Sequence, residues 1–489
     1  MNGVIRLDQK DHFLDSFLNP ESIAIVGATK NPIKMNFQIT ENLHRLNFSG
    51  KIYPVNPTSK EILGMKTYSS IREISDDIDL VISAVPSSLT LGVVNECVDV
   101  GIKRMVIVAG GFSDGDAEGE KLHNEIARIT KENNIRVLGP NTLSPINPSK
   151  NLVISFHPVD ELRTGGLSFV FQSGLYEYKL NWIFSHLGVS KIIDLGNKMD
   201  INEVDALEYL SNDPETKAIA MHVESVRGDG RRFMQLLQST SKKKPIIVLK
   251  SGRTAAGSKA AASHTGSIAH ENDVLFDCVL KQAGVIRAHN LDEFFDYAKT
   301  FSYLNLPRGN RIAVINLSGG EGVIATDSCE QNGFQLAKLK DETHEKVKGV
   351  FPPWEVPLNP LDIGVCAQFH FSDFNKILNS FISVIEDENV DCMLMQFFPT
   401  SSFEKMMPAS PKSSRSANSM IMDLFAGIFV KMKEKGKPLA LWRSSMEIAE
   451  SEFVKNLELK GIPVFSSSEK GANALAALYR YKVMREERE

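Results

Sequence analysis

Three short stretches of this chain carry side chains suited to phosphoryl transfer. Ser173 and Gly174 follow one apolar run, and Glu224 ends another. His264 follows a run of small residues. A neutral imidazole nitrogen accepts a phosphoryl group, a carboxylate can stabilise the resulting cation, and a glycine turn at a helix start can hold phosphate oxygens. Each stretch alone has an ordinary structural explanation, but together they indicate phosphoryl transfer to His264.

The segment before His264 has hardly a bulky side chain, reading SGRTAAGSKAAA from Ser251 to Ala262. This composition predicts a flexible loop in which the histidine has room to move. A mobile phosphohistidine could carry phosphate between two sites. Gly266, just beyond the histidine, joins Ser173 and Gly174 as a predicted phosphate ligand.

The elements that must position these residues follow an α/β pattern. In the N-terminal third, apolar runs rich in β-branched residues alternate with helix-like stretches, which predicts a parallel sheet covered on both faces. Ligands of such sheets lie beyond the carboxyl ends of the strands. The runs are 22–28, 52–55, 79–86, 104–111 and 135–141. Their ends carry small and turn-forming residues, which let backbone approach a ligand closely.

The first glycine turn, GATKNP, departs from the dinucleotide fingerprint. It has one glycine, whereas the fingerprint has three, and the second strand ends in Asn56 and Pro57 without a carboxylate for a ribose hydroxyl. NAD is therefore disfavoured. These residues by themselves leave coenzyme A, a sugar nucleotide and no ligand as alternatives.

Two further cycles of strands and helices follow the first. One contains GGLSFVFQSG, KIIDLGNKMD, AIAMHVESV and PIIVLKSGR; the other opens with RIAVINLSGGEGVIATDSCEQNG. We therefore predict an α/β protein of three doubly wound units. Their predicted ranges are 1–150, 151–306 and 307–489.

Composition narrows the classes of function. The 489 residues carry a formal net charge of −5, which disfavours nucleic acid as a partner. No apolar run is long enough for a membrane helix, and the polar start is unlike a signal peptide. The five cysteines are widely spaced without a CxxC pair, which predicts reduced thiols, no metal site and a cytoplasmic protein.

An ordered series of motifs resembles the α-type half of the ADP-forming acyl-CoA synthetases, relatives of succinyl-CoA synthetase. Each motif resembles a family segment in the same order along nearly the whole chain. The motifs are GPNTLSPINP (139–148), FQSG (171–174), the segment 195–226 that ends in HVESV, SHTGSIA (263–269) and NLSGGEGVIATDSCEQNG (316–333).

The resemblance implies an N-terminal Rossmann-like CoA-binding domain followed by two flavodoxin-like domains of the succinyl-CoA synthetase type. It implies that His264 is the phosphorylated nucleophile, Glu224 its partner, and Ser173 and Gly174 phosphate ligands. Its implied CoA contacts are Gly27, Thr29, Asn56, Pro57, Val85, Pro86, Gly111 and Asn141.

The chain departs from the family pattern at three places. Thr58 stands where the family often has lysine, and Met35 stands where it has glycine. LYEYKL follows Gly174 where small residues are common. The first two departures affect the implied CoA contacts, and the third points to an unusual acyl group.

The family also uses an ATP-grasp module, and no part of this chain is left for one. The resemblance therefore implies a separate β-type subunit that binds ATP or ADP and Mg²⁺. The implied reaction joins a small carboxylic acid to CoA with ATP, giving acyl-CoA, ADP and phosphate through acyl phosphate and phosphohistidine. The alternative is a non-catalytic CoA-binding regulatory or scaffold protein with the same fold.

Overall fold

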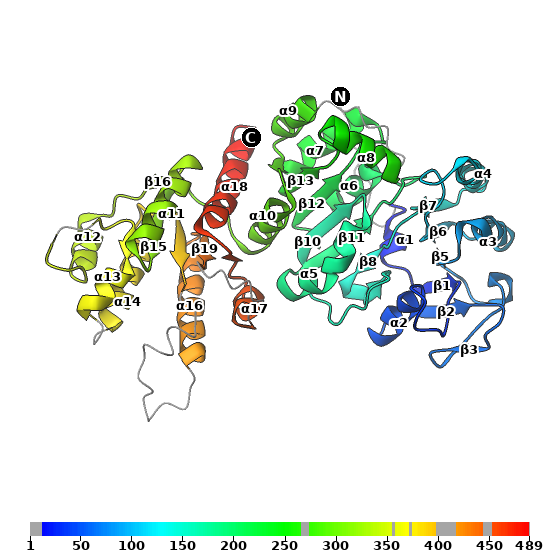
Figure 1. Cartoon of the computed structure of the whole chain (residues 1–489), viewed down its shortest axis with the longest axis horizontal. Helices are drawn as coiled ribbons and strands as arrows, with labels where there is room; N and C mark the ends of the chain where they lie inside the picture. Colours follow the sequence, from blue (N-terminus) through cyan, green and yellow to red (C-terminus); the bar gives the residue numbers. More distant parts are fainter. Residues whose placement is uncertain are drawn as a thin grey trace. The chain divides into compact units, whose positions relative to one another are not determined.

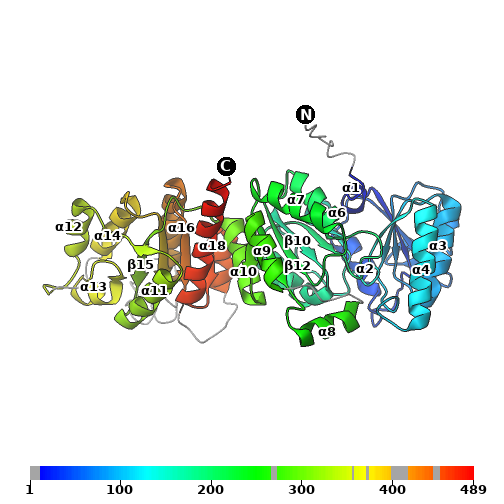
Figure 2. The ribbon, with the colours of Figure 1, turned by 90° about the horizontal axis from the view of Figure 1, so that it is seen from above.

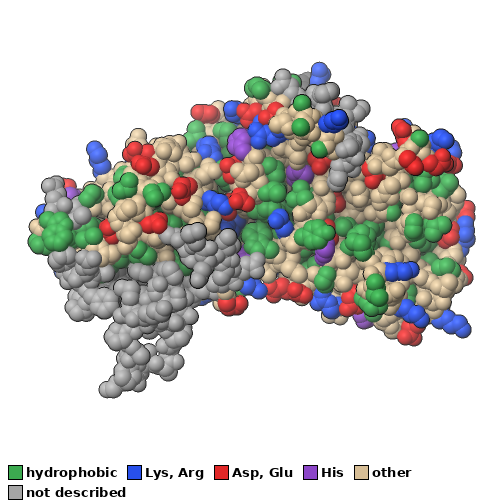
Figure 3. Space-filling model, in the orientation of Figure 1, with side chains coloured by type: hydrophobic (Ala, Val, Ile, Leu, Met, Phe, Trp, Pro, Cys, Tyr) green, Lys and Arg blue, Asp and Glu red, His purple; other side chains and the backbone are tan. Residues whose placement is uncertain are grey.

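The structure is a computed structural model that describes residues 12–265, 273–354, 357–370, 374–397, 417–443 and 452–488. The chain forms two compact units, Met1–Asn290 and Leu291–Glu489 (Figure 1). None of the helices in the described ranges is long and apolar enough to cross a membrane. On the face drawn in Figure 3, acidic and basic side chains are interspersed.

The first sheet of unit 1 is parallel and has the order β2-β1-β5-β6-β7. Because the chain turns from β1 to β2 on one side and returns to β5 on the other, the strand order reverses between β1 and β5. Its strands are β1 Ser22–Val26, β2 Lys51–Val55, β5 Leu80–Ser83, β6 Arg104–Ile107 and β7 Arg136–Leu138. A small hairpin, β3 Glu61–Ile62 and β4 Met65–Lys66, and the turn η2 Ile71–Glu73 follow β2.

Helices cover both faces of this sheet, as the apolar strands require (Figure 2). Helices α3 (Ser87–Val100) and α4 (Ala117–Glu132) pack together on one face, and α2 (Phe37–Arg45) lies on the other. Asp116 begins α4 by accepting hydrogen bonds from the N–H groups of Glu118 and Gly119, at 3.1 and 2.9 Å.

The second sheet of unit 1 has the order β14-β13-β12-β10-β11-β8-β9. Its central strands are parallel, and the short pair β8–β9 adds an antiparallel edge. The strands are β8 Ile146–Asn147, β9 Leu152–Val153, β10 Thr164–Phe171, β11 Val189–Asp194, β12 Ala218–Val223, β13 Ile246–Lys250 and β14 Ile286–Ala288. The helices and turns are η3 Pro148–Lys150, η4 Gly174–Lys179, α5 Leu180–His186, α6 Glu203–Asn212, α7 Gly230–Ser241, α8 Ala255–Thr265 and α9 Asp273–Ala283.

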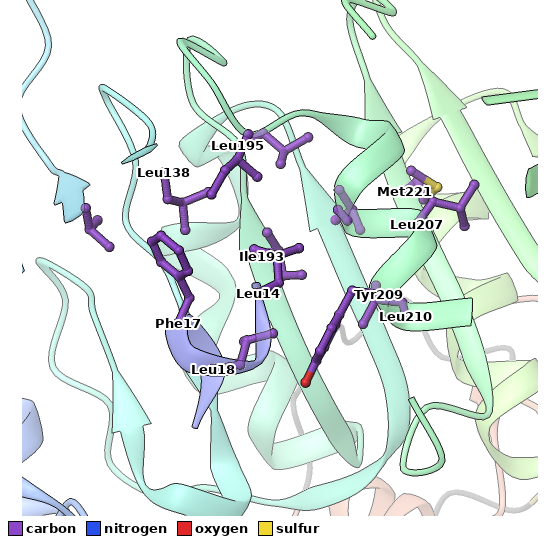
Figure 4. Close-up of a cluster of buried hydrophobic side chains, with 14 of the residues drawn as sticks. Leu14, Phe17, Leu18, Leu138, Ile193, Leu195, Leu207, Tyr209, Leu210 and Met221 are labelled. Atoms are coloured by element: carbon purple, nitrogen blue, oxygen red, sulfur yellow. The ribbon is translucent and has the colours of Figure 1, made fainter. Parts of the chain in front are cut away.

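One hydrophobic core runs through both sheets of unit 1. The short helix α1 (Asp15–Leu18) and the residue before it contribute Leu14, Phe17 and Leu18 to this core. In Figure 4 Phe17 lies beside Leu138 of the first sheet and Leu14 beside Ile193 of the second. The two sheets therefore share one buried interior, and their facing edges are held in a fixed relation.

Unit 2 is built on a sheet of order β16-β15-β18-β19-β20, with β17 also paired to β15. The strands are β15 Arg311–Asn316, β16 Gln335–Leu336, β17 Leu361–Asp362, β18 Cys392–Gln396, β19 Leu439–Trp442 and β20 Val464–Phe465. The helices are α10 Leu291–Tyr303, α11 Gly319–Gln331, α12 Asp341–Lys348, α13 Ile363–His370, α14 Phe374–Glu386, α16 Ala417–Glu434, α17 Glu452–Leu459 and α18 Ser468–Glu486. Helices α11 and α18 pack together on this sheet, and α10 packs on α18.

The α/β fold class of three doubly wound sheets is confirmed. Two elements cross the predicted domain boundaries: β8 precedes residue 151 yet belongs to the second sheet, and α10 precedes residue 307 yet packs on α18. The prediction of a loop before His264 is wrong for residues 255–265, which form helix α8. An alanine-rich stretch favours helix, because alanine loses the least conformational freedom there.

Candidate functional site

The first candidate region is the carboxyl edge of the first sheet, where the strand order reverses. Gly27 follows β1 with φ +91°, and a Cβ there would lie 2.7 Å from the carbonyl oxygen of Ala84 and 2.9 Å from Val85. The turns after β1 and β5 therefore touch, and only glycine fits between them. This contact places Gly27 beside Val85 and Pro86 at the position where doubly wound sheets bind ligands.

Asparagine side chains brace the turns around this edge. Asn36 donates to the carbonyl oxygen of Gly27 at 2.6 Å, and Asn56 donates to that of Ala28 at 2.8 Å. Thr58, which stands where lysine is common in the family that the motifs resemble, instead donates to the Asn56 side chain at 2.9 Å. The turns after β1 and β2 are thus joined by Asn56, and Thr29 and Pro57 lie within them.

The far end of this edge is linked to the second sheet. Asp114 accepts from the N–H of Gly111 at 3.1 Å and from the Asn197 side chain at 2.7 Å. Asn141 has φ +60° and lies within reach of Gly110, since a Cβ on Gly110 would be 3.3 Å from its side-chain oxygen. The predicted residues Gly111 and Asn141 therefore border the turn after β11, which carries Asn197.

The second candidate region begins at Ser173 and Gly174, directly after β10. Ser173 is the N-cap of the 3-10 helix η4, and its side chain makes no capping hydrogen bond. Gly174 is exposed. The helix turn then buries Tyr176, whose hydroxyl donates to the Leu143 carbonyl at 2.6 Å. The backbone turn predicted for phosphate is present at the carboxyl edge of the second sheet.

The same 3-10 helix contains a buried acid, Glu177. It accepts a hydrogen bond from the Ser155 hydroxyl at 2.7 Å, and its exposure is 3%. Burial raises the pKa of Glu177 to about 8, and the negative charge of Asp194 adds to this rise. Burial likewise raises the pKa of Asp194 to about 6. Glu177 is therefore mostly protonated at neutral pH in the folded chain.

Glu224 follows β12 directly, as predicted, and is 8% exposed. Its backbone N–H donates to the side-chain oxygen of Gln172 at 2.7 Å. Its carbonyl accepts from the ammonium of Lys250 at 2.7 Å. Since Gln172 precedes Ser173, one side chain joins the predicted phosphate turn to the backbone of Glu224.

The turn after Glu224 is held by a second set of buried charges. Lys198 donates to Glu203 at 3.0 Å and to the carbonyl of Ser225 at 2.6 Å. Glu203 in turn accepts from the N–H groups of Arg227 and Gly228 at 2.7 and 2.8 Å. The loop after β12 is thus fastened to the loop after β11.

A buried histidine lies on the same strand. His222 is 3% exposed, and its Nε2 is hydrogen bonded to the hydroxyl of Ser251. Burial lowers the pKa of His222 to about 4, with a further contribution from the charges of Lys250 and Lys198. His222 is therefore neutral in the folded chain at neutral pH.

Helix α8 leads from this region to His264. The hydroxyl of Ser258 donates to the Gly252 carbonyl at 2.7 Å, and a Cβ on Gly252 would lie 3.5 Å from Ala261. The helix therefore folds back on the turn after β13. Of His264 the structure describes the backbone, in the last turn of α8, and Gly266 lies outside the described residues.

The site contains several residues that sequence reasoning missed. Each has a polar or charged side chain that lies between the carboxyl end of a buried strand and the start of the α-helix that follows it. The missed residues are Asn36, Asp114, Gln172, Glu177, Asn197, Lys198, Glu203 and Lys250. In the described ranges, no group of three His, Cys, Asp or Glu side chains could hold a metal ion.

Both sheets of unit 1 lie in segments that match known domain families, and these families define the class of protein. Residues 21–147 match the CoA binding domain family, and residues 164–301 match the succinyl-CoA ligase like flavodoxin domain family. These ranges coincide with the sheet that carries the Gly27 turn and with the sheet that carries Ser173 and Glu224.

Similar proteins narrow the class to one family. Acetate–CoA ligase [ADP-forming] II subunit alpha of Pyrococcus furiosus is 35% identical over 471 residues, which are 95% of this chain and 97% of that protein. Acetate–CoA ligase [ADP-forming] II of Archaeoglobus fulgidus is 34% identical over 97% of this chain and 68% of its own length. The chain belongs to the family of the ADP-forming acetate–CoA ligases.

A solved structure agrees over the whole chain. The dinucleotide-forming acetyl-coenzyme A synthetase 1 of Ca. Korarchaeum cryptofilum, in complex with phosphate and ADP, has a TM-score of 0.82. It is 31% identical, and the similarity covers 97% of each chain.

Proposed function

We propose that this chain is the α-type subunit of an ADP-forming acid–CoA ligase that acts through acyl phosphate and a phosphohistidine at His264. The observation that carries the proposal is the pair of hydrogen bonds that hold the backbone of Glu224. Gln172 joins it to the Ser173 turn, and Lys250 joins it to the strand that leads into the His264 helix. Membership of the family supports the reaction class.

In the acyl-CoA-consuming direction the reaction has three steps. Phosphate attacks the acyl carbonyl, the C–S bond breaks, and CoA leaves as acyl phosphate forms. A nitrogen of His264 then attacks phosphorus, and the carboxylic acid leaves. Finally the phosphohistidine passes its phosphoryl group to ADP, giving ATP and free His264. Each step is reversible, so the same residues serve synthesis of acyl-CoA.

The residues of this chain have distinct roles in that scheme. Backbone N–H groups at Ser173 and Gly174 hold the phosphate oxygens, because the start of a helix carries partial positive charge. Glu224 accepts a hydrogen bond from the other imidazole nitrogen and stabilises the cationic phosphoimidazole. CoA lies over Gly27, Thr29, Asn56, Pro57, Val85, Pro86, Gly111 and Asn141.

The nucleotide belongs to a partner in this proposal. The matched families are a CoA-binding domain and a flavodoxin-like ligase domain, and one relative is named as a subunit alpha. We infer a separate ATP-grasp β subunit that supplies ADP or ATP and Mg²⁺. We further infer a cytoplasmic enzyme that takes a small carboxylic acid. Acetate is the first acid to test, because the relatives carry its name.

Labelling of the lone chain tests the proposal. Purified chain given ³²P-phosphate and acetyl-CoA should gain an acid-labile, alkali-stable label that is absent from His264→Ala. ATP should label the lone chain poorly, and added β subunit should restore labelling from ATP. Label that persists in His264→Ala would refute the nucleophile. Efficient labelling of the rigorously purified chain by ATP would refute the separate nucleotide subunit.

A further inference from the structure

The loop that carries Glu224 depends on a lysine that no motif singled out. We propose that Lys198 is a positioning residue for Glu224: its buried ammonium holds the carbonyl of Ser225, the residue after Glu224, and so fixes the loop that carries the carboxylate. This inference rests on the proposed function, because it assigns Lys198 to the same phosphorylation of His264.

The contacts of Lys198 place it between two loops. It follows β11 in a left-handed conformation, with φ +53°, and is 4% exposed. Its ammonium donates to the Ser225 carbonyl at 2.6 Å and pairs with Glu203 at 3.0 Å. The first hydrogen bond therefore holds the peptide group between Ser225 and Val226, one residue beyond Glu224.

Glu203 joins the same two loops at a second point. One of its oxygens accepts from the ammonium of Lys198, and the other accepts from the N–H groups of Arg227 and Gly228. The guanidinium of Arg227 donates back to the carbonyl of Asn197 at 2.7 Å. The Glu224 loop is therefore tied at both ends to the β11–α6 loop.

Two buried lysines act on the loop that carries Glu224, Lys250 from the end of β13 and Lys198 from the loop after β11. Lys250 donates to the Glu224 carbonyl, and Lys198 donates to the Ser225 carbonyl. Burial lowers the pKa of Lys198, and the charge and hydrogen bond of Glu203 oppose this decrease, with a smaller contribution from the charge of Glu224. Loss of the Lys198 ammonium should release the loop that carries Glu224 and so weaken the stabilisation that Glu224 gives to the phosphohistidine.

The chain offers a matched control at the opposite edge of the same sheet. Lys244 lies just before β13 and donates to the carbonyls of Leu210 and Asp213, at 2.8 and 2.6 Å. Like Lys198, it holds a loop by two oxygen acceptors, but it lies at the edge where the parallel strands begin. Lys244→Met therefore shows how far the labelling rate falls when the lost lysine holds a loop remote from the site.

The test is a rate of His264 labelling from acetyl-CoA and ³²P-phosphate. Lys198→Met should lower the maximal rate about 10- to 100-fold, as expected for a lost charge-assisted interaction. The acetyl-CoA concentration at half-maximal rate should stay within about twofold. Lys244→Met should leave the rate within about threefold of wild type. If Lys198→Met does not fold, Lys198→Met/Glu203→Gln removes both charges together and should show the same slow labelling.

A double-mutant cycle shows whether Lys198 acts through Glu224. The double variant Lys198→Met/Glu224→Gln should be about as slow as Glu224→Gln alone, because the second change removes what the first one acts on. Losses that simply multiply, or labelling of Lys198→Met at the rate of Lys244→Met, would overturn this inference alone. Absence of label from the wild-type chain would overturn the proposed function as well.

Discussion

Unit 1 should lose stability at alkaline pH because of the acid buried under the Ser173 turn. Glu177 has an ordinary pKa of 4.5 that burial raises to about 8 in the folded chain. Between these values the folded chain keeps a proton that the unfolded chain has released. Stability is therefore fully present below pH 4.5 and falls as the pH rises through about 8.

The size of this loss follows from the difference between the two pKa values. The folded and unfolded pKa values of Glu177 differ by about 3.5, and a difference of one in pKa corresponds to about 1.36 kcal/mol. The largest loss of unfolding free energy from this group is therefore about 5 kcal/mol. Local opening of η4 lets water reach the carboxylate, so we expect about 2–5 kcal/mol of unfolding free energy. Asp194, whose pKa burial raises to about 6, acts in the same direction at lower pH. Comparing wild type with Glu177→Gln isolates the Glu177 contribution.

The assay is urea unfolding at several pH values from 5 to 9, followed by tryptophan fluorescence, in which Trp182 of α5 reports on unit 1. Glu177→Gln should be within about 1 kcal/mol of wild type at pH 5 and become more stable than wild type by about 2–5 kcal/mol at pH 9. The exposed Glu125→Gln on α4 serves as the control and should show no such trend. A difference between Glu177→Gln and wild type that stays constant with pH would refute the reasoning.

Three further outcomes are expected. Glu224→Gln should fold as wild type and slow His264 labelling about 10- to 150-fold, because an amide cannot offset the charge of the phosphoimidazole; an unchanged rate would place the orienting group elsewhere. Gly196→Ala should lower the unfolding free energy of unit 1 by about 2–5 kcal/mol, measured in urea. Gly196 has φ +53°, and a Cβ there would overlap the carbonyl oxygen of Pro140 and lie 2.7 Å from the carbonyl oxygen of Asn141. Gly101→Ala, at φ +78° with open space around it, should lose only about 1 kcal/mol, and equal losses would contradict the overlap. In titration calorimetry the full chain should bind CoA and should not bind NADH more tightly; the reverse order would overturn the assignment of the first sheet.

The elements that sequence reasoning placed well are those fixed by local pattern. Buried β-branched runs with glycine at their ends predicted the parallel strands, and Glu224 was correctly placed at the end of one of them. Helix α8 was missed because its small residues were interpreted as a loop, although alanine favours helix and Thr254 accepts from the N–H of Gly257 in its first turn.

The supporting residues were missed for a different reason. Gln172 and Lys198 bind carbonyl or N–H groups more than 25 residues away in the chain, and nothing in their local sequence indicates those partners. In the string LGNKMD, Lys198 looks like a solvent-exposed lysine. Its burial follows from the left-handed backbone at this position and from Glu203, which the helix α6 brings beside it.

The core that runs through both sheets of unit 1 has a consequence for recombination among genes of this family. Because Leu14, Phe17 and Leu18 pack against residues of both sheets, a CoA-binding domain cut out near residue 150 would expose apolar surface on each side. Exchange of that domain alone between relatives should give chains that aggregate. A crossover near residue 290, where unit 1 ends, moves the two sheets together and keeps their shared interior intact. Chimeras between this chain and its relatives should therefore be designed with the first 290 residues as one block.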